Sequence, residues 1–177
     1  TDDGLLFKWS RDLDVDKVVD ANDGLVPGEF LNMGFDMLKP LSKFKKMATI
    51  TNMMEDKGKM MNYLRMEQWV GDSPSQAGEC YRKFIKDLYQ ENKLIKGEFK
   101  LGNRTVNLSD IKTPILTIYA SEDNLVPPSA TKPLNDNVSS KDKTLYEFPG
   151  GHIGVFVGGR SQKELAPKVS EWLKERD

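Results

Sequence analysis

The sequence has few of the residues that form disulfides or bind metals: among 177 residues there is one cysteine, Cys80, and one histidine, His152. A single cysteine excludes an intrachain disulfide, and this composition is typical of a reducing, intracellular compartment. No apolar run reaches the roughly 18 to 20 residues that a membrane-spanning helix needs. We therefore expect a soluble chain without a membrane span, and no motif indicates a metal or a cofactor.

The chain also lacks an excess of either charge. Its 26 Lys and Arg nearly balance its 27 Asp and Glu, which argues against nucleic acid as the main partner. Apolar residues make up 38% of the sequence, enough to bury the core of one domain. Residues 1–4 lack an initiating Met and resemble mid-chain sequence, so we expect a piece of a longer protein or a processed chain.

Methionine marks the first part of the chain, because all eight lie between Met33 and Met66. Short helical patterns there are interrupted by Gly and Pro, which indicates an irregular helical subdomain over residues 1–72. The methionines have two interpretations that the pattern leaves open. They form ordinary helical core, or a flexible apolar surface that repacks around an apolar substrate or partner.

A helix is predicted from Pro74 to about Asn92. Ser73 stands at its N-cap position, with Gln76 three residues later and Pro74 at the first helical position. The apolar residues recur at the spacing of one helix face: Ala77, Tyr81, Phe84, Ile85 and Leu88. Cys80 lies at the edge of that face.

After this helix the apolar period changes to two, which is typical of strands. Residues 99–108 predict a hairpin around a Gly-Asn turn. The β-branched run 114–120 predicts a strand buried on both faces of a parallel sheet, and residues 144–148 predict a second strand. A closing helix is expected over residues 164–176, with Leu165, Val169, Trp172 and Leu173 on its apolar side. Residues 73–177 therefore have an α/β pattern.

His152 follows the second predicted strand, within the glycine-rich residues 149–154. Glycines on both sides allow a sharp turn at the carboxyl end of the sheet, and His is the side chain best suited to move protons near neutral pH. Asp123 follows the first predicted strand, so the two side chains are able to meet where α/β sites gather. In a catalytic triad such a carboxylate orients the His, whereas alone the His is as easily structural and the Asp a turn former.

The nucleophile of such a triad is missing. No G-x-S-x-G or G-x-C-x-G occurs in the chain, and the nearest match, residues 78–82 around Cys80, lacks the final Gly and lies inside the predicted amphipathic helix. We therefore interpret Cys80 as a packing residue. Because the nucleophile precedes the acid and the His in an α/β-hydrolase, we expect it, and the oxyanion hole beside it, upstream of Thr1.

Several long and unusual segments are spread along nearly the whole chain: GLLFKWSRD at 4–12, VPGEF at 26–30, DSP with QAGE at 72–79, FIKDLYQ at 84–90 and FPGGHIG at 148–154. They resemble polyhydroxyalkanoate synthases, and most closely the two-subunit kinds, class III and class IV. The resemblance implies the C-terminal part of an α/β-hydrolase fold, with a helical cap over residues 1–72 and the last strands and helix of the core over residues 73–177.

The resemblance implies an acyltransferase that polymerises (R)-3-hydroxyacyl-CoA and releases CoA, with the CoA thioester as substrate and no cofactor. The family His falls on His152 and the family Asp on Asp123, while the family Cys has no counterpart here, so the chain alone is expected to be inactive. The resemblance further implies a mobile cap over the active site, a homodimer, a second synthase subunit, and a cytoplasmic location at the surface of polyester granules.

Two other hypotheses stay open. A depolymerase, thioesterase or lipase of the same fold would use an upstream Ser in place of Cys. Alternatively, the 177 residues form a noncatalytic cap or interaction module that binds a partner subunit or a granule surface. Independently of function, half of a parallel sheet would leave the strand at 114–120 with an uncovered edge, so we expect poor solubility or self-association of the isolated chain.

Overall fold

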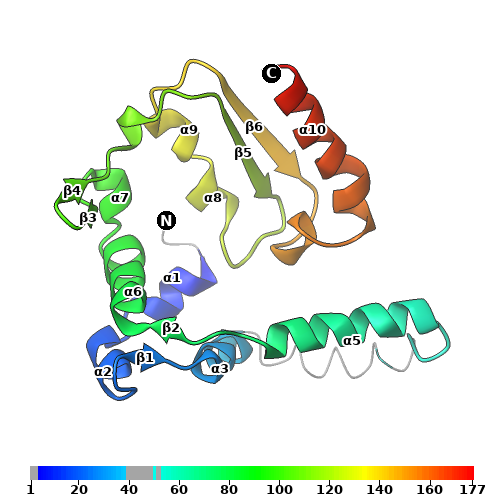
Figure 1. Cartoon of the computed structure of the whole chain (residues 1–177), viewed down its shortest axis with the longest axis horizontal. Helices are drawn as coiled ribbons and strands as arrows, with labels where there is room; N and C mark the ends of the chain where they lie inside the picture. The colour runs from blue at the N-terminus through cyan, green and yellow to red at the C-terminus, as the bar shows by residue number, and fades with distance from the viewer. Residues whose placement is uncertain (1–3, 39–49, 51–52) are drawn as a thin grey trace. The chain divides into compact units, whose positions relative to one another are not determined.

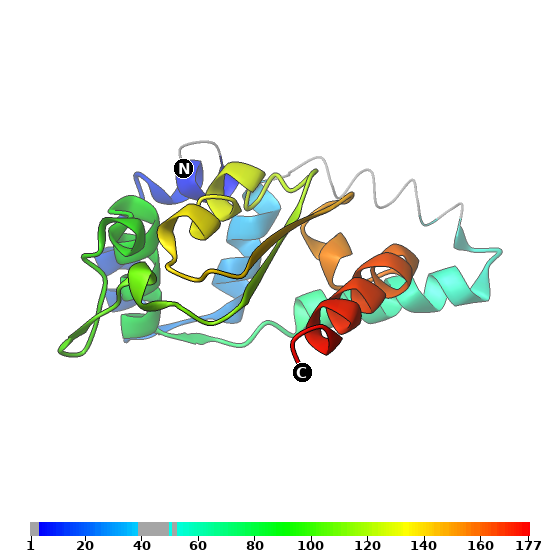
Figure 2. The same cartoon turned by 90° about the horizontal axis from the view of Figure 1, so that it is seen from above.

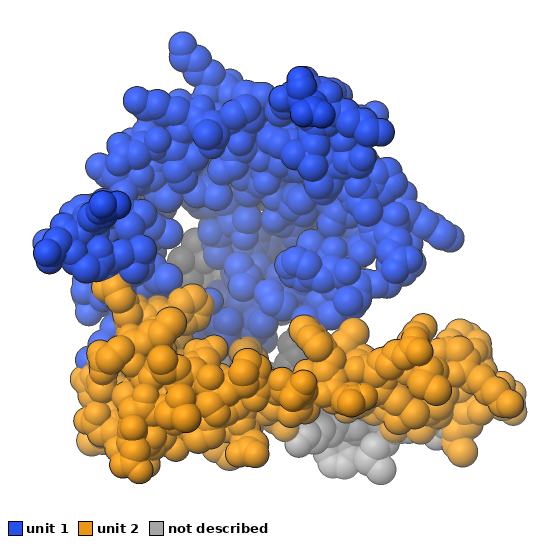
Figure 3. All heavy atoms as spheres, in the orientation of Figure 1, with its two compact units in different colours: residues 1–13, 86–177 blue, residues 14–85 orange. Residues whose placement is uncertain are grey.

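The computed structural model describes residues 4–38, 50 and 53–177 of the chain. The chain forms two compact units, which Figure 3 colours separately. One unit is Asp14–Ile85, and the other joins the chain up to Leu13 with Lys86–Asp177. The assignment of a cap to residues 1–72 and of a core to residues 73–177 stays a prediction.

The unit Asp14–Ile85 contains short helices and one small ladder (Figure 1). Asp14 caps the first helix by accepting the backbone N–H of Lys17. Asp56 does the same for the longest helix, where it accepts the N–H of Gly58 and Lys59. The short helices predicted in the first part of the chain are thus confirmed. In chain order the elements are α2 Val15–Asp20, β1 Leu25–Val26, α3 Gly28–Leu38, α5 Lys57–Gly71, β2 Gln76–Ala77 and α6 Gly78–Lys83.

A close backbone contact packs α6 against α2 and the turn that follows it. β1 and β2 are antiparallel, and Gly78 directly after β2 donates its N–H to the carbonyl of Gly24 at 2.7 Å. A Cβ at Gly78 would lie 2.3 Å from Val19 Cγ1 and 2.6 Å from Gly24 O, so a larger residue requires a backbone shift. Among the described residues of this unit, the buried apolar core consists of Val15, Val19, Val26, Tyr81 and Ile85.

The other unit is built on two parallel strands, β5 Ile115–Ala120 and β6 Lys143–Phe148, which lie side by side in Figures 1 and 2. Both occur where the sequence predicts strands, and their parallel pairing is confirmed. The chain's other elements are α1 Leu5–Ser10, a π-helical turn Phe84–Gln90, α7 Lys93–Lys96, β3 Lys100–Leu101, β4 Arg104–Thr105, a 3-10 turn Leu108–Asp110, α8 Pro128–Thr131, α9 Leu134–Asn137, a 3-10 turn Ile153–Val155, a π-helical turn Ser161–Leu165 and α10 Ala166–Lys174.

Helices contact both faces of the β5–β6 pair. Thr117 of β5 donates its hydroxyl to Asn135 Oδ1 of α9 at 2.5 Å. Trp172 Nε1 of α10 donates to Thr144 Oγ1 of β6 at 2.8 Å. Thr144 pairs with Leu116, the neighbour of Thr117, and successive residues of a strand point to opposite faces, so α9 and α10 lie on opposite sides. The predicted hairpin is also present, as β3 pairs antiparallel with β4.

The predicted helix start at Pro74 is wrong. Residues 76–77 form β2 instead, and the helix begins at Gly78 and continues through the π-helical turn to Gln90. Ser73 does not cap it: its Oγ donates to Asn32 Oδ1 at 2.8 Å and lies 2.9 Å from the carbonyl oxygen of Val70. Pairing of β2 with a distant strand thus overrides the local capping signal.

The predicted apolar helix faces are only partly buried. Tyr81, Ile85 and Leu165 are buried as expected. The prediction is wrong for three other members of these faces, which are exposed: Ala77, Phe84 and Leu173.

The methionines belong mainly to the surface in the described part of the chain. Four of them have side chains at least half exposed, namely Met33, Met37, Met54 and Met61. Met47 lies outside the described residues. For these four, the interpretation as ordinary helical core is wrong, and the alternative of an adaptable apolar surface is favoured.

Replacing Gly78 with alanine is expected to lower the free energy of unfolding by about 1–3 kcal/mol, because the new methyl group meets Val19 Cγ1 and the Gly24 carbonyl, which the Gly78 N–H holds by a hydrogen bond. Gly71→Ala is the matched control, since nothing lies within 4 Å of its Cβ position. Urea unfolding followed by circular dichroism measures both variants. Equal unfolding midpoints would contradict the packing argument.

The isolated chain is expected to self-associate or to dissolve poorly. Within the described residues β5 pairs only with β6, so its other edge has no strand partner. Size-exclusion chromatography and analytical ultracentrifugation measure the association. A monodisperse monomer with one cooperative melting transition would show this expectation to be wrong.

Candidate active site

The loops that follow β5 and β6 lie against each other at the carboxyl ends of the two strands. Two backbone hydrogen bonds continue the pairing past the strand ends. Ser121 N donates to the carbonyl of Phe148, and Glu122 N donates to the carbonyl of Gly150, each at 2.9 Å. The two loops are therefore held together before the candidate side chains begin.

Asp123 and His152 meet just beyond these bonds. Oδ2 of Asp123 lies 2.7 Å from Nδ1 of His152, within hydrogen-bond distance. The side chain of Asp123 is 8% exposed and that of His152 is 39% exposed. The carboxylate is thus nearly enclosed, while the imidazole keeps an accessible part.

The loop of Asp123 fixes its carboxylate independently of the histidine. Oδ1 accepts the backbone N–H groups of Leu125 and Val126, each at 2.9 Å. This is the turn that an Asp forms with the residues two and three positions later. One carboxylate oxygen therefore shapes the loop, and the other one faces the imidazole.

Glycine allows the loop of His152 to pass close to the core. A Cβ at Gly150 would lie 2.8 Å from the ring of Phe148, which is 1% exposed. His152 then begins the short 3-10 turn Ile153–Val155, and Arg160 donates to the carbonyl of Pro149 at 2.8 Å. Of the glycines predicted to hold this imidazole at the end of the strand, Gly150 is the one that such a close contact requires.

The geometry suits proton transfer. A carboxylate only accepts hydrogen bonds, so in the neutral imidazole the proton lies on Nδ1 and points to Asp123. The other ring nitrogen, Nε2, then carries the lone pair that is able to take a proton from a nucleophile. The pair has the arrangement of a base and the carboxylate that orients it.

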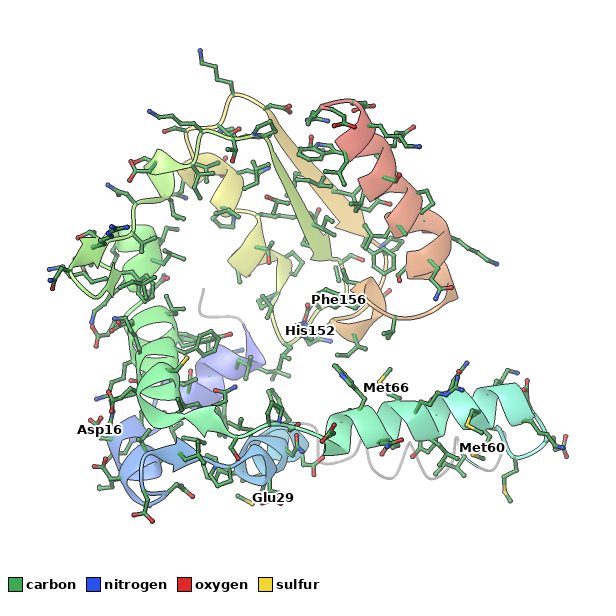
Figure 4. The ribbon with its side chains drawn as sticks, viewed as in Figure 1. Asp16, Glu29, Met60, Met66, His152 and Phe156 are labelled. Atoms are coloured by element: carbon green, nitrogen blue, oxygen red, sulfur yellow. The ribbon has the colours of Figure 1, made fainter. Side chains whose placement is uncertain are left out.

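An apolar surface continues from the histidine. Ile153, Phe156 and Val157 are 41%, 79% and 43% exposed, and Figure 4 shows Phe156 close to His152 in the view of Figure 1. Phe156 and Val157 were not predicted as site residues, and Ile153 was noted only as part of the segment 148–154, although the apolar residues after His152 are visible in the sequence. The N–H groups of Leu125 and Val126 were not predicted as partners of Asp123, although an Asp that follows a strand is a typical turn former.

Cys80 does not have the local structure of a nucleophile elbow. It is exposed and lies in the regular helix α6, rather than at a sharp turn between a strand and a helix. Its exposure also means that it is not a buried packing residue.

The described residues contain no group of three or more His, Cys, Asp or Glu that is suited to a metal ion. In residues 4–38, 50 and 53–177, no helix is both long and apolar enough to cross a membrane.

Comparison with known proteins identifies relatives of the whole chain. The poly(3-hydroxyalkanoate) polymerase subunit PhaC of Allochromatium vinosum is 47% identical over 177 residues, which are 99% of this chain and 50% of the relative. The protein of the same name from Synechocystis is 48% identical over 166 residues, 93% of this chain and 44% of the relative. The one from Haloarcula marismortui is 39% identical over 176 residues, 98% and 37% respectively.

The chain thus spans about half the length, or less, of these curated relatives. A family model described as PHB de-polymerase C-terminus matches residues 35–177, which is most of the chain. The chain therefore belongs to this family, and its resemblance to polyhydroxyalkanoate synthases is confirmed.

Proposed function

We propose that this chain is part of a polyhydroxyalkanoate synthase that polymerises (R)-3-hydroxyacyl-CoA into polyester and releases CoA. Asp123 and His152 supply two members of a Cys-His-Asp triad, and the Cys belongs to a part of the enzyme outside these 177 residues. The observation that carries the proposal is the 2.7 Å contact between the imidazole and the carboxylate after two parallel strands, in a chain whose relatives are polymerase subunits.

The proposed fold is the last part of an α/β-hydrolase sheet. β5 and β6 are parallel, and their loops carry the acid and the histidine in the order that this fold uses. Residues 1–72 supply the cap of the active site, except that α1 lies in the compact unit of Asp123 and His152. The exposed methionines of that region support a surface that adapts to an apolar acyl chain or partner.

Nε2 of His152 takes the proton of the cysteine thiol, and the thiolate attacks the thioester carbonyl of the bound hydroxyacyl-CoA. The acyl-enzyme thioester forms while the bond to the CoA sulfur breaks, and the proton passes from His152 to the leaving CoA thiolate. For elongation, a hydroxyl oxygen attacks an acyl thioester and gives its proton to His152. The departing thiolate then takes that proton.

Asp123 acts by orienting His152 rather than on the substrate hydroxyl. Oδ1 already accepts two backbone N–H groups, and Oδ2 faces Nδ1 of the imidazole. With the side chain only 8% exposed, little of the carboxylate is accessible to a substrate hydroxyl. The exposed apolar residues Ile153, Phe156 and Val157 beside His152 suit the hydroxyacyl chain instead.

The active enzyme assembles further components around this chain. The nucleophile comes from an upstream part of the same enzyme, and a second synthase subunit and a second copy complete it. It works in the cytoplasm at the surface of polyester granules. Exposed apolar side chains in both units support such contacts, among them Trp69, Met37, Phe156 and Leu173.

Hydrolysis is the second candidate function. The matching family is described by the name of a depolymerase, and the same acid and histidine would serve a Ser in the upstream elbow. The residue at that elbow separates the two functions, since a synthase has Cys there and a hydrolase Ser. A noncatalytic cap or interaction module would need neither Asp123 nor His152.

We call the full-length enzyme, which contains this chain and the upstream part with the nucleophile, the parent enzyme. Only the intact parent enzyme is expected to release CoA from (R)-3-hydroxybutyryl-CoA. The isolated chain is expected to be inactive, and His152→Ala in the parent to lower kcat by about 10²- to 10⁴-fold, because the thiol loses its base. A thiol-reactive dye measures the released CoA. Cys80→Ser is the matched control and should leave the rate unchanged.

Three outcomes would contradict the proposal in different ways. Activity of the isolated chain would place the nucleophile within it and make Cys80 the candidate nucleophile. A parent enzyme that releases no CoA from (R)-3-hydroxybutyryl-CoA but hydrolyses polyester would favour the depolymerase. A parent that keeps its rate with His152→Ala would support the noncatalytic module.

Asp123→Asn is expected to lower kcat of the parent by a similar factor, about 10²- to 10⁴-fold, with little change in KM. The amide oxygen still accepts from the loop, but an amide N–H facing Nδ1 forces the ring proton onto Nε2. Glu122→Gln, which removes the same charge from the exposed neighbouring residue, is the control. Equal rates for Asp123→Asn and Glu122→Gln would show that Asp123 has no role in the reaction.

A further inference from the structure

A short N-terminal helix, α1, lies against the loop that carries Asp123. Gly4 precedes this helix and is buried, and Leu5 N donates to the carbonyl of Asn124 at 3.3 Å. A Cβ at Gly4 would lie 3.0 Å from Pro127 Cδ and 3.2 Å from the carbonyl oxygen of Leu125. The start of α1 therefore contacts the loop on the residues directly after the acid.

These contacts reach the groups that hold the carboxylate. Oδ1 of Asp123 accepts the N–H groups of Leu125 and Val126, and these residues lie between Asn124 and Pro127, which α1 contacts. A displacement of this stretch moves both N–H donors. Because both oxygens belong to one carboxylate, such a displacement would also turn Oδ2 away from Nδ1 of His152, which lies 2.7 Å from it.

The far end of α1 is fixed by a side chain from a distant part of the sequence. Gln90 Nε2 donates to the carbonyl of Ser10 at 2.8 Å and to that of Leu13 at 2.9 Å. Ser10 is 1% exposed, so water has little access to its carbonyl if the hydrogen bond from Gln90 is removed. All of these residues belong to the same compact unit as Asp123 and His152.

We propose that α1 is a positioning element for the catalytic pair: Gly4 seats it on the acid loop, Gln90 fixes its other end, and together they keep Asp123 aligned with His152. The proposal rests on the proposed catalytic role of these two residues. In this proposal Gly4 and Gln90 have no contact with substrate or reacting atoms and act only through the carboxylate.

Gly4→Ala in the intact parent enzyme tests the contact. Gly4 has φ −69° and ψ 145°, a conformation that alanine adopts without strain, so an effect of the methyl group comes from its contact with Leu125 and Pro127. We expect kcat to fall about tenfold with unchanged KM, because a misplacement of about 1 Å costs on the order of 10²-fold and this shift is smaller. Gly159→Ala, with nothing within 4 Å of its Cβ position, is the control.

Gln90→Met supplies a second, independent variant, since it keeps the length of the side chain and removes both donated hydrogen bonds. We expect the same loss of kcat at unchanged KM. If Gly4→Ala lowers the yield of folded enzyme, Gln90→Met still decides the question from the other end of α1.

Repeating both substitutions in the Asp123→Asn background separates positioning from a merely structural role. Positioning through Asp123 predicts that each variant changes kcat by less than about twofold there, because the alignment it disturbs is already lost. A loss of melting temperature with unchanged kcat, or the same loss of kcat in both backgrounds, would overturn the proposal. An Asp123→Asn enzyme with full activity would instead overturn the proposed function itself.

Discussion

Backbone pairing between two parallel strands is the interaction on which the candidate site depends. The ladder of β5 and β6 continues past the strand ends through Ser121 and Glu122, so the loops that follow are in register before any side chain meets. Helices then hold the two strands from both faces of the sheet. Thr117 of β5 contacts α9 on one face, and Trp172 of α10 contacts Thr144 of β6 on the other. The 2.7 Å contact between Asp123 and His152 is the result of this register.

The parts that could be predicted from the sequence are those in which local signals and the fold agree. A continuous β-branched run is typical of a strand in a parallel sheet. Gly150 is needed because a Cβ at this position would meet the buried ring of Phe148. Because parallel strands present their carboxyl ends at one edge, the order of strand, Asp123, strand and His152 was enough to predict that the two side chains are able to meet.

The parts that could not be predicted depend on contacts between residues far apart in the sequence. The capping pattern at Ser73 and Pro74 is a valid helix signal, but pairing of β2 with β1 uses the following residues, and the Ser73 hydroxyl bonds to Asn32. Likewise, nothing near Gln90 indicates that its side chain holds the carbonyls of Ser10 and Leu13. Local propensity is a weak constraint wherever such tertiary contacts compete with it.

Asp123 shows why the structural and the catalytic interpretation of one residue need not exclude each other. As a turn former it uses Oδ1 to accept the N–H groups of Leu125 and Val126, and this bonding leaves Oδ2 directed at His152. A carboxylate held only by the histidine would be free to rotate, and rotation would release the imidazole from its orientation. Because the turn removes that freedom, the residue that shapes the loop is also well placed for the orienting role that we propose for it.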